Sequence, residues 1–352
     1  MTTVKIATRC LVLILLAGAY SHAPPPLQPG ARGGLGSCSV SPGSIFSVHE
    51  FALPAKYSFP GGIAAGPDGN VWFSETGADK IGRITPEGAI TEFPLTPASG
   101  PIGIVLGPGG NLWFAETYAN KIGVITPAGV VIGEYPVPTA NSDDRYLAYG
   151  PDGNVWFTET LGDKIGRITP QGAITEFPLS GKANSGPQRI IAGPDGNLWF
   201  TYGTSPNDAV VRMTPGGVLT QFSIPENDSR ADNELADGIA VGPDGNLWFT
   251  QLGSVIGVLT PSGSFVAQYP VRRAGTQNPG AAGITLGPDG KVYFTGRASN
   301  TIGYLVPPAD FGFYRIPSPR ALPSTITVGP DGNLWFTEDA ANKVACLALQ
   351  HH

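Results

Sequence analysis

The segment Gly66-Pro67-Asp68-Gly69-Asn70-Val71-Trp72-Phe73 joins a tight turn to an apolar strand, and closely similar segments recur along the chain. The copies begin at Gly66, Gly107, Gly150, Gly193, Gly242, Gly287 and Gly329. Their spacing is about 43 residues, a period typical of repeat architectures built from small sheets. In such a fold the repeat decides the topology before any single residue does.

One repeat, residues 61–95, contains four short strand-like segments separated by turns. Residues 62–65 are small and apolar, and the Gly-Pro-Asp-Gly turn leads into residues 71–75. Residues 80–84 and 89–95 follow as the third and fourth segments, and Pro94 belongs to the fourth. Because proline is tolerated in sheets mainly at an edge, we expect this strand to be outermost. The sequence therefore predicts an all-β fold, a seven-bladed β-propeller with four antiparallel strands per blade.

The seventh repeat is incomplete, because the chain ends after its third strand, which runs from Lys343 to about Leu349. The missing strand is found at the other end of the propeller. His49-Glu50-Phe51-Ala52-Leu53 matches the fourth-strand segments Thr91-Glu92-Phe93-Pro94-Leu95 and Thr175-Glu176-Phe177-Pro178-Leu179. We expect the N-terminal strand to complete the last blade and close the ring, which removes exposed sheet edges.

The first residues have the features of an export signal. Lys5 and Arg9 precede the apolar run 10–19, and Ser21-His22-Ala23 provides a cleavage site. We expect a signal peptide over 1–23, a Pro/Gly/Ser-rich leader over 24–44, and the propeller over 45–352. The mature protein is then secreted or periplasmic, without a membrane span, and monomeric. With a net charge of -6 and no Lys/Arg run, the chain does not have the composition of a nucleic-acid binder.

An aromatic residue follows the turn in every repeat: Trp72, Trp113, Trp156, Trp199, Trp248, Tyr293 and Trp335. Because the aromatic recurs in all seven, we interpret it as packing between neighbouring blades rather than as a stacking surface for a ligand. The Gly-Pro-Asp-Gly segments lack the spaced acidic ligands of a calcium loop, so we interpret them as turns.

Two cysteines remain after export, Cys38 and Cys346. Export favours a disulfide over free thiols, although spacing alone leaves the geometry open. The repeat register suggests that Cys346 faces Val48. A bridge between Cys38 and Cys346 would fasten the ring closure covalently.

The second strand ends in glutamate in four adjacent blades, at Glu75, Glu116, Glu159 and Glu338. Five residues later each of these blades has a lysine: Lys80, Lys121, Lys164 and Lys343. The joint presence favours ion pairs across a hairpin, and a half-ring of carboxylates that holds a cation is the alternative.

One face of the propeller gathers the turns between second and third strands and the connections between blades, which vary in length and polarity. Function is expected on this variable face. The residue near the start of each innermost strand points at the channel mouth, and in ring order these are Gly61, Ile102, Arg145, Gln188, Asp237, Ala282 and Ser324. The predicted ligand-binding residues lie over blades three to five: Arg145, Gln188, Arg189, Tyr202, Asp237 and Gln251. The longest connection, residues 225–236, carries Asp228, Arg230, Asp232 and Glu234 in the same sector.

Blade three carries the segments Trp156-Phe157-Thr158-Glu159, Lys164-Ile165-Gly166-Arg167-Ile168-Thr169-Pro170 and Ile174-Thr175-Glu176-Phe177-Pro178-Leu179. These resemble the streptogramin B lyases, the virginiamycin B lyase family, and the resemblance covers residues 45 to 349. It implies a seven-bladed propeller that opens a cyclic depsipeptide by elimination at an ester, with a magnesium ion. It also implies a Pro-His pair at the start of innermost strands, with a glutamate nearby.

The chain departs from the family pattern at those histidines. The seven positions at the channel mouth contain none, and the four histidines of the chain are His22, His49, His351 and His352. None is placed to act as a general base near the channel. Asp237 or Glu159 could replace histidine as the base only with a raised pKa.

Two functions therefore remain open. The first is a secreted propeller that binds a small molecule, a peptide or a cell-surface ligand on its variable face. The second is an enzyme, a carbon-oxygen lyase or metal-dependent hydrolase that opens a cyclic ester or lactone, with magnesium as its candidate cofactor.

Overall fold

The computed structural model describes residues 37–179, 186–203, 208–225, 236–251, 255–271, 279–307 and 310–350. The predicted signal peptide lies outside them. Residues Leu35–His352 form one compact unit, so residues 37–44, which the sequence analysis assigns to the leader, belong to the folded part. No helix among the described residues is long and apolar enough to cross a membrane.

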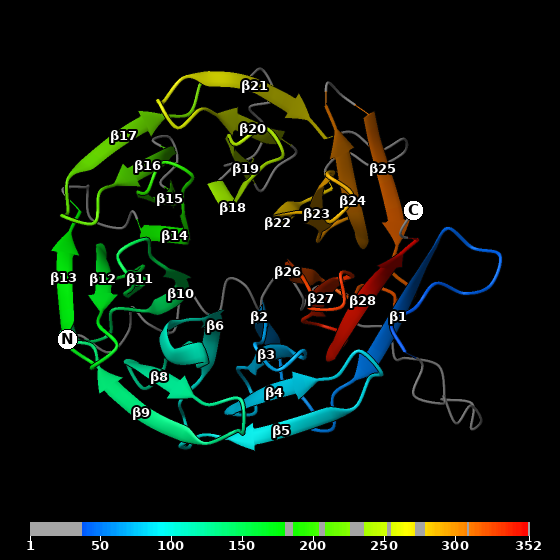
Figure 1. The fold of residues 1–352 in the computed structure, drawn as a ribbon, viewed down its shortest axis with the longest axis horizontal. Coiled ribbons are helices and arrows are strands. Elements are labelled where there is room, and N and C mark those ends of the chain that lie inside the picture. Colours follow the sequence, from blue (N-terminus) through cyan, green and yellow to red (C-terminus); the bar gives the residue numbers. More distant parts are fainter. Residues whose placement is uncertain are drawn as a thin grey trace, which may run out of the picture. The chain divides into compact units, whose positions relative to one another are not determined.

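Seven four-stranded antiparallel sheets surround a central channel (Figure 1). This confirms the predicted seven-bladed propeller. The innermost strands are β2 (Pro60–Ala65), β6 (Pro101–Leu106), β10 (Asp144–Tyr149), β14 (Gly186–Ala192), β18 (Ala236–Val241), β22 (Ala281–Leu286) and β26 (Pro323–Val328). The second strands are β3 (Val71–Glu75), β7 (Leu112–Glu116), β11 (Val155–Glu159), β15 (Leu198–Gly203), β19 (Leu247–Gln251), β23 (Val292–Gly296) and β27 (Leu334–Glu338).

The outer half of each blade follows the same order. The third strands are β4 (Lys80–Ile84), β8 (Lys121–Ile125), β12 (Lys164–Ile168), β16 (Ala209–Met213), β20 (Val255–Leu259), β24 (Thr301–Val306) and β28 (Lys343–Leu349). The outermost strands are β5 (Ile90–Pro94), β9 (Val131–Pro136), β13 (Ile174–Pro178), β17 (Leu219–Ser223), β21 (Phe265–Pro270), β25 (Asp310–Arg315) and β1 (Phe46–Ala52). Within the described residues the one helical segment is the short 3₁₀ turn η1 (Pro108–Gly110).

The N-terminal strand closes the ring as the sequence predicts, because β1 pairs antiparallel with β28 in blade seven. The predicted register was wrong by one residue. Cys346 pairs with His49, and Val48 pairs with Leu347. The equivalent pair in blade one is Arg83 with Thr91, which is the register that the alignment of His49 with Thr91 demands.

The turn aspartate of the repeat fixes the buried aromatic residue that follows it. Asp68 Oδ1 accepts a 3.0 Å hydrogen bond from the Trp72 indole, and Asp244 accepts one of 2.9 Å from Trp248. The same bond forms at Trp156, Trp199 and Trp335, and the Tyr293 hydroxyl donates to Asp289 in blade six. These turns thus satisfy buried indoles, which explains why aspartate recurs in them.

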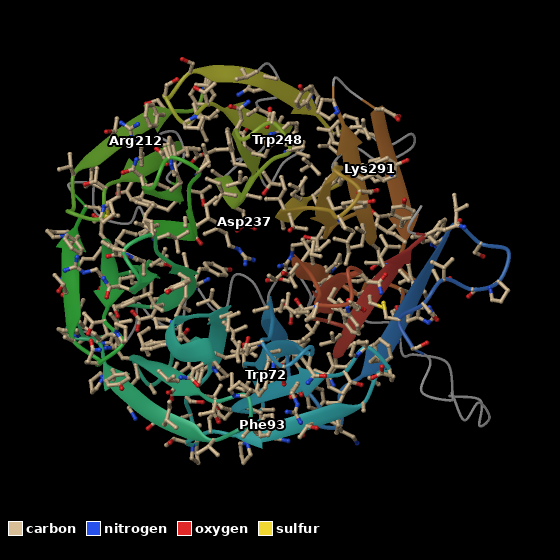
Figure 2. The ribbon with its side chains drawn as sticks, viewed as in Figure 1. Trp72, Phe93, Arg212, Asp237, Trp248 and Lys291 are labelled. Carbon is tan, nitrogen blue, oxygen red and sulfur yellow. A yellow bond between two sulfur atoms is a disulfide. The ribbon has the colours of Figure 1, made fainter. Side chains whose placement is uncertain are left out.

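Neighbouring blades are joined by contacts of the repeated aromatic residue, as the sequence predicts. Trp72 is fully buried in a cluster with Ile104 and Phe114 of blade two, and it stacks on Phe93 at a centroid distance of 5.3 Å (Figure 2). The hydroxyl of Ser74 donates to the backbone carbonyl of Ile102 in the next blade, 2.5 Å away. Packing between blades, as expected, is the role of the aromatic row.

The connections on the variable face are held by asparagine or aspartate in the second-to-third turn. Asn120, at φ 57, donates to the carbonyls of Val137 and Thr139 and accepts from the amide of Ser142. Asn342 holds the first connection in the same way, through Ser58 and Ala55. Such side chains tolerate the left-handed conformation that the turn requires, and they give the described part of the variable face a fixed frame.

Candidate ligand site in the central channel

Each innermost strand carries the same β-bulge at the channel mouth. In blade one the register with the second strand shifts between Pro60 and Ile63, which leaves Gly61 and Gly62 in the bulge. The other six innermost strands shift at the equivalent place. A bulge interrupts the alternation of side chains and changes where they point. The seven positions that the sequence singled out are the first bulge residues of each blade.

The second bulge residue is glycine in four blades: Gly62, Gly103, Gly238 and Gly283. A Cβ atom at Gly103 would lie 2.2 Å from the backbone oxygen of Arg145, and one at Gly238 would lie 2.3 Å from that of Ala282. Glycine therefore allows neighbouring innermost strands to approach closely. Blades three, four and seven have Tyr146, Arg189 and Thr325 at this position.

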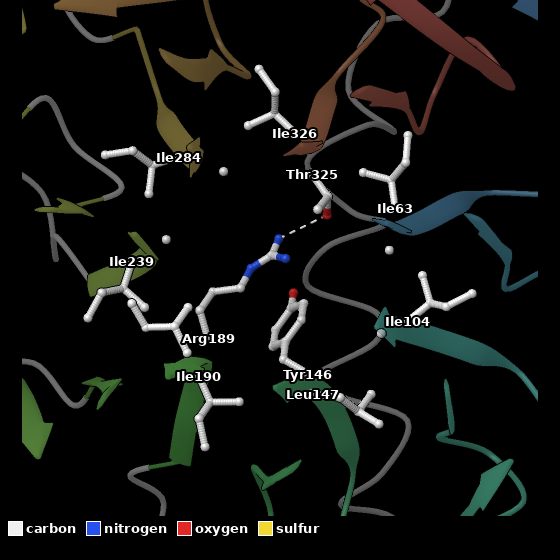
Figure 3. Close-up of a pocket in the computed structure, with 15 residues that line it drawn as sticks. Ile63, Ile104, Tyr146, Leu147, Arg189, Ile190, Ile239, Ile284, Thr325 and Ile326 are labelled. Atoms are coloured by element: carbon white, nitrogen blue, oxygen red, sulfur yellow. Dashed lines mark hydrogen bonds between the residues drawn. The ribbon is translucent and has the colours of Figure 1, made fainter. Parts of the chain in front are cut away.

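Those three exceptions bring their side chains into one cavity in the channel (Figure 3). Its volume is about 150 Å³, and its wall is otherwise formed by the bulge glycines and a ring of aliphatic residues. The ring contains Ile63, Ile104, Leu147, Ile190, Ile239, Ile284 and Ile326. A mainly apolar cavity with a few convergent polar groups is the usual form of a small-molecule site.

Arg189 crosses this cavity from blade four toward blade seven. Its Nη2 donates to Thr325 Oγ1 at 3.1 Å, and its guanidinium carbon lies 3.9 Å from the centre of the Tyr146 ring. Nε lies 3.8 Å from Asp237 Oδ1, too far for a hydrogen bond. Nε is buried and has no hydrogen-bond partner. The arginine is thus held in place, with part of its donor capacity unused.

A second arginine reaches the same bulge of blade seven. Arg297 Nη1 donates to Ser324 Oγ at 3.3 Å, and Ser324 directly precedes Thr325. Arg297 Nη2 lies 3.8 Å from Asp339 Oδ2. Burial raises the pKa of the Asp339 carboxyl, and the charge of Arg297 opposes that rise. Two guanidinium groups therefore contact adjacent residues of one bulge, each with an acidic partner beyond hydrogen-bond distance.

The predicted ligand-binding residues divide into two groups. Arg189 lines the cavity, and Asp237, on the channel side of blade five (Figure 2), lies beside it. The other four are absent from the described cavity wall. Arg145 Nε forms a 2.9 Å ion pair with Asp143, and the buried Tyr202 donates to Asp163 at 2.9 Å.

Gln251 is buried at the end of β19, and Gln188 is half-buried beside Arg189. The predicted acidic and basic residues of the long connection, from Asp228 to Glu234, lie outside the described residues.

Sequence reasoning missed Tyr146, Thr325 and Arg297. For the first two a signal was present, because each replaces the glycine of the second bulge position. Arg297 directly follows β23, at the position where blades one to three have Thr76, Thr117 and Thr160, so its departure from threonine was a signal as well.

The four second-strand glutamates are buried inside their own blades. Glu75, Glu116, Glu159 and Glu338 are 0% exposed, and neither oxygen of any of them has a hydrogen-bond partner. Burial raises the pKa of Glu75 and Glu116 to about 7, and that of Glu159 and Glu338 to about 8.

The lysines that were expected to pair with these glutamates bind a different carboxylate. Lys121 Nζ lies 3.2 Å from Glu134, Lys164 lies 2.6 Å from Glu176, and Lys343 lies 2.7 Å from Glu50. Lys80 pairs in the same way with Glu92. The predicted hairpin pair was therefore wrong, because each lysine binds the glutamate of the outermost strand. That glutamate keeps access to water, so its ionised form costs less.

The magnesium that the family resemblance implies does not fit these four glutamates. Each lies in a different blade beside its own outer-strand glutamate. Within the described ranges no group of three or more acidic, histidine or cysteine side chains is arranged to hold a metal.

Cys38 and Cys346 form a disulfide with a Cα–Cα distance of 6.2 Å. The Asn333 side chain donates to the Cys38 carbonyl, and the Cys38 amide donates to Pro86 of blade one. The bridge thus fastens the start of the folded chain to blade seven. His49 lies on β1 with Nε2 2.7 Å from the Ser39 carbonyl, at the outer edge of blade seven rather than in the channel.

The known proteins to which this chain is similar include several virginiamycin B (streptogramin B) lyases. The model of the virginiamycin B lyase family matches residues 43–145, 96–273 and 230–351. A streptogramin B lyase structure is 33% identical, covers 87% of this chain and 98% of its own, and superposes with a TM-score of 0.78.

A catalytically inactive histidine-to-alanine variant of virginiamycin B lyase from Staphylococcus aureus, with quinupristin, is 34% identical. It covers 87% of this chain and all of its own, again with a TM-score of 0.78. A virginiamycin B lyase of Bordetella bronchiseptica is 46% identical over 39 residues, which are 11% of this chain and 13% of that protein.

Proposed function

The chain belongs to the virginiamycin B lyase family, and from that membership and the mainly apolar channel cavity with its few convergent polar groups we propose that it is a ligand-binding propeller. The ligand enters from the variable face and contacts the bulge residues of blades three, four and seven. No lyase step accompanies binding. The observation that carries this proposal is the set Tyr146, Arg189 and Thr325. These residues stand where the other four blades have glycine, and they bring polar groups to the wall of the channel cavity.

The distribution of histidine supports binding without elimination. Three of the four histidines are near the chain ends, and His49 is bonded to a backbone carbonyl on β1. The carboxylates named as substitute bases are poorly placed. Glu159 is fully buried, and its pKa of about 8 arises inside blade three, away from the cavity wall. Asp237 Oδ1 lies 3.8 Å from Arg189 Nε, an ion pair without a hydrogen bond.

The proposal also includes export and a monomeric state. The sequence begins with an export-type segment, and a disulfide is typical of oxidising compartments. The ligand is a small molecule or peptide rather than nucleic acid, because the net charge is -6.

The alternative function is a carbon-oxygen lyase or hydrolase, and one experiment separates the two. Purified protein is incubated with quinupristin and magnesium, and the products are followed by chromatography with fragmentation mass spectrometry. Elimination opens the ring without changing the mass, whereas hydrolysis adds one water. We expect intact quinupristin. Ring opening that disappears in Asp237→Asn or Glu159→Gln would establish the enzyme and overturn the proposal.

A further inference from the structure

We propose that the channel cavity binds the carboxylate of a short aliphatic acid, with Arg189 as the contact and Arg297, which lies outside the described cavity wall, as a second cation at the adjoining bulge. This inference rests on the proposed ligand-binding function and names the chemistry of the ligand. The aliphatic part of the acid lies against the ring of isoleucines, and its carboxylate faces the bulge of blade seven.

The first support is the unused donor capacity of Arg189. A guanidinium has five N–H donors, and Arg189 makes one hydrogen bond to a described residue, through Nη2 to Thr325. Nε is buried without an acceptor. A buried donor that lacks an acceptor favours a ligand that supplies one.

The second support is that the guanidinium is oriented in advance. The face of Tyr146 lies 3.9 Å from the guanidinium carbon, and Thr325 holds one of the terminal nitrogens. Because one face of the guanidinium is covered by the Tyr146 ring, its N–H groups point outward in the plane of the guanidinium. A carboxylate is planar and accepts two parallel bonds from such an edge.

The third support is a second cation at the same bulge. Arg297 contacts Ser324, the neighbour of Thr325, and its distance of 3.8 Å to Asp339 equals that between Arg189 and Asp237. Neither acidic partner is within hydrogen-bond distance. Both contacts are ion pairs without a hydrogen bond, so an added carboxylate can accept N–H groups that the aspartates do not.

Charge and size narrow the class of ligand. Asp237 and Asp339 lie beside the two arginines, so the aspartates repel a ligand with one negative charge less than a ligand with two. This disfavours a phosphate dianion. A volume of about 150 Å³ and a wall of Ile239, Ile284 and Ile326 suit a short apolar tail.

The test is a ligand-observed NMR titration of the full protein with sodium propionate at constant ionic strength. Propionamide, which has the same shape without the charge, and inorganic phosphate are the comparison probes. We expect saturable propionate binding at least tenfold tighter than either. Equal binding of propionamide, or no saturable binding of propionate, would overturn the proposal without any variant being made.

Two matched variants locate the site. Arg189→Gln should weaken propionate binding at least tenfold while the tryptophan fluorescence of the folded protein is kept. Arg83→Gln is the control, because Arg83 also stacks on aromatic rings, Trp72 and Phe93, but lies outside the cavity. Unchanged binding in Arg189→Gln would refute the assignment. Quinupristin turnover would overturn the binding-only function instead, so the two failures are distinguishable.

Discussion

Replacing Glu338 by glutamine should stabilise the protein at alkaline pH and leave it nearly unchanged at acid pH. Glu338 is 0% exposed, and neither carboxylate oxygen has a hydrogen-bond partner. Burial is the main cause of its raised pKa, the nearby charge of Glu50 adds to it, and Lys343 opposes it. Glutamine has nearly the same shape as the protonated acid and cannot ionise.

The sign follows from proton binding. Between the ordinary pKa of 4.5 and the folded value of about 8, the folded state holds a proton that the unfolded chain releases. The free energy of unfolding therefore falls as the pH rises through this window. One pKa unit corresponds to about 1.36 kcal/mol, so the shift sets an upper limit of about 5 kcal/mol. Because Glu50 and Lys343 share the shift, we expect about 2–4 kcal/mol.

The assay is urea unfolding followed by tryptophan fluorescence at pH 5, 7 and 9. The difference between Glu338→Gln and the wild type should move in favour of the variant as the pH rises. Glu176→Gln is the control, because hydrogen bonds from Lys164 and Thr139 outweigh burial and lower the pKa of Glu176. That variant should lose stability at pH 7 and 9. A stability difference for Glu338→Gln that is the same at pH 5 and pH 9 would refute the reasoning.

Three further predictions concern the scaffold. Asp244→Ala should lower the free energy of unfolding by about 1–3 kcal/mol, because the buried Trp248 indole loses its acceptor. Asp244→Asn should retain most of the stability, because its amide oxygen can still accept the bond. The urea midpoints of the two variants and the wild type measure the difference. Cys346→Ser should cost about 2–5 kcal/mol and speed proteolysis of the N-terminal strand, and equal digestion rates would contradict this. Gly103→Ala should cost about 1–3 kcal/mol, because its Cβ would lie 2.2 Å from the Arg145 oxygen; an unchanged melting temperature would show that the strands can separate.

The sequence predicts the fold well because every structural role occurs seven times. The proline of the fourth strand, the turn before the aromatic and the match of His49-Glu50-Phe51 to Thr91-Glu92-Phe93 each indicate one position in the blade. Together they determine the strand order and the closure. The same match also determines the register of β1, because it pairs Cys346 with His49 rather than with Val48.

The ion pairs of the glutamate and lysine pattern were harder to predict, because the choice of carboxylate depends on which glutamate is buried. Glu75 and Lys80 are register partners, yet Lys80 binds Glu92 on the other side. Only the four blades with the buried glutamate carry a glutamate at the outer position: Glu92, Glu134, Glu176 and Glu50. The outer-strand glutamate, which accompanies the buried glutamate and the lysine in each of these blades, was therefore visible in the sequence. Which of the two carboxylates keeps its charge is decided by access to water, which the sequence does not contain.

The channel residues were predicted only in part, for a reason that lies in the bulge. Side-chain alternation along a strand tells which residues share a face, and a bulge interrupts that alternation. The sequence therefore located the start of each innermost strand correctly but could not tell which of two consecutive residues enters the channel. The sequence predicts Arg145 and Ser324 at the channel mouth, whereas Tyr146 and Thr325 line the cavity.

The same bulge explains how the family fold can be kept while the chemistry of its channel changes. Where the next blade's carbonyl approaches to within 2.5 Å of a Cβ position, as at Gly62, only glycine fits. Where a blade departs from glycine, as at Arg189, the side chain enters the channel. The four glycine positions are therefore constrained by the neighbouring strand, whereas the three remaining positions carry side chains whose chemistry can differ within the same ring. In this chain the second bulge residues of blades three, four and seven supply the polar groups of the cavity wall, and Arg189 is the charged one among the described lining residues.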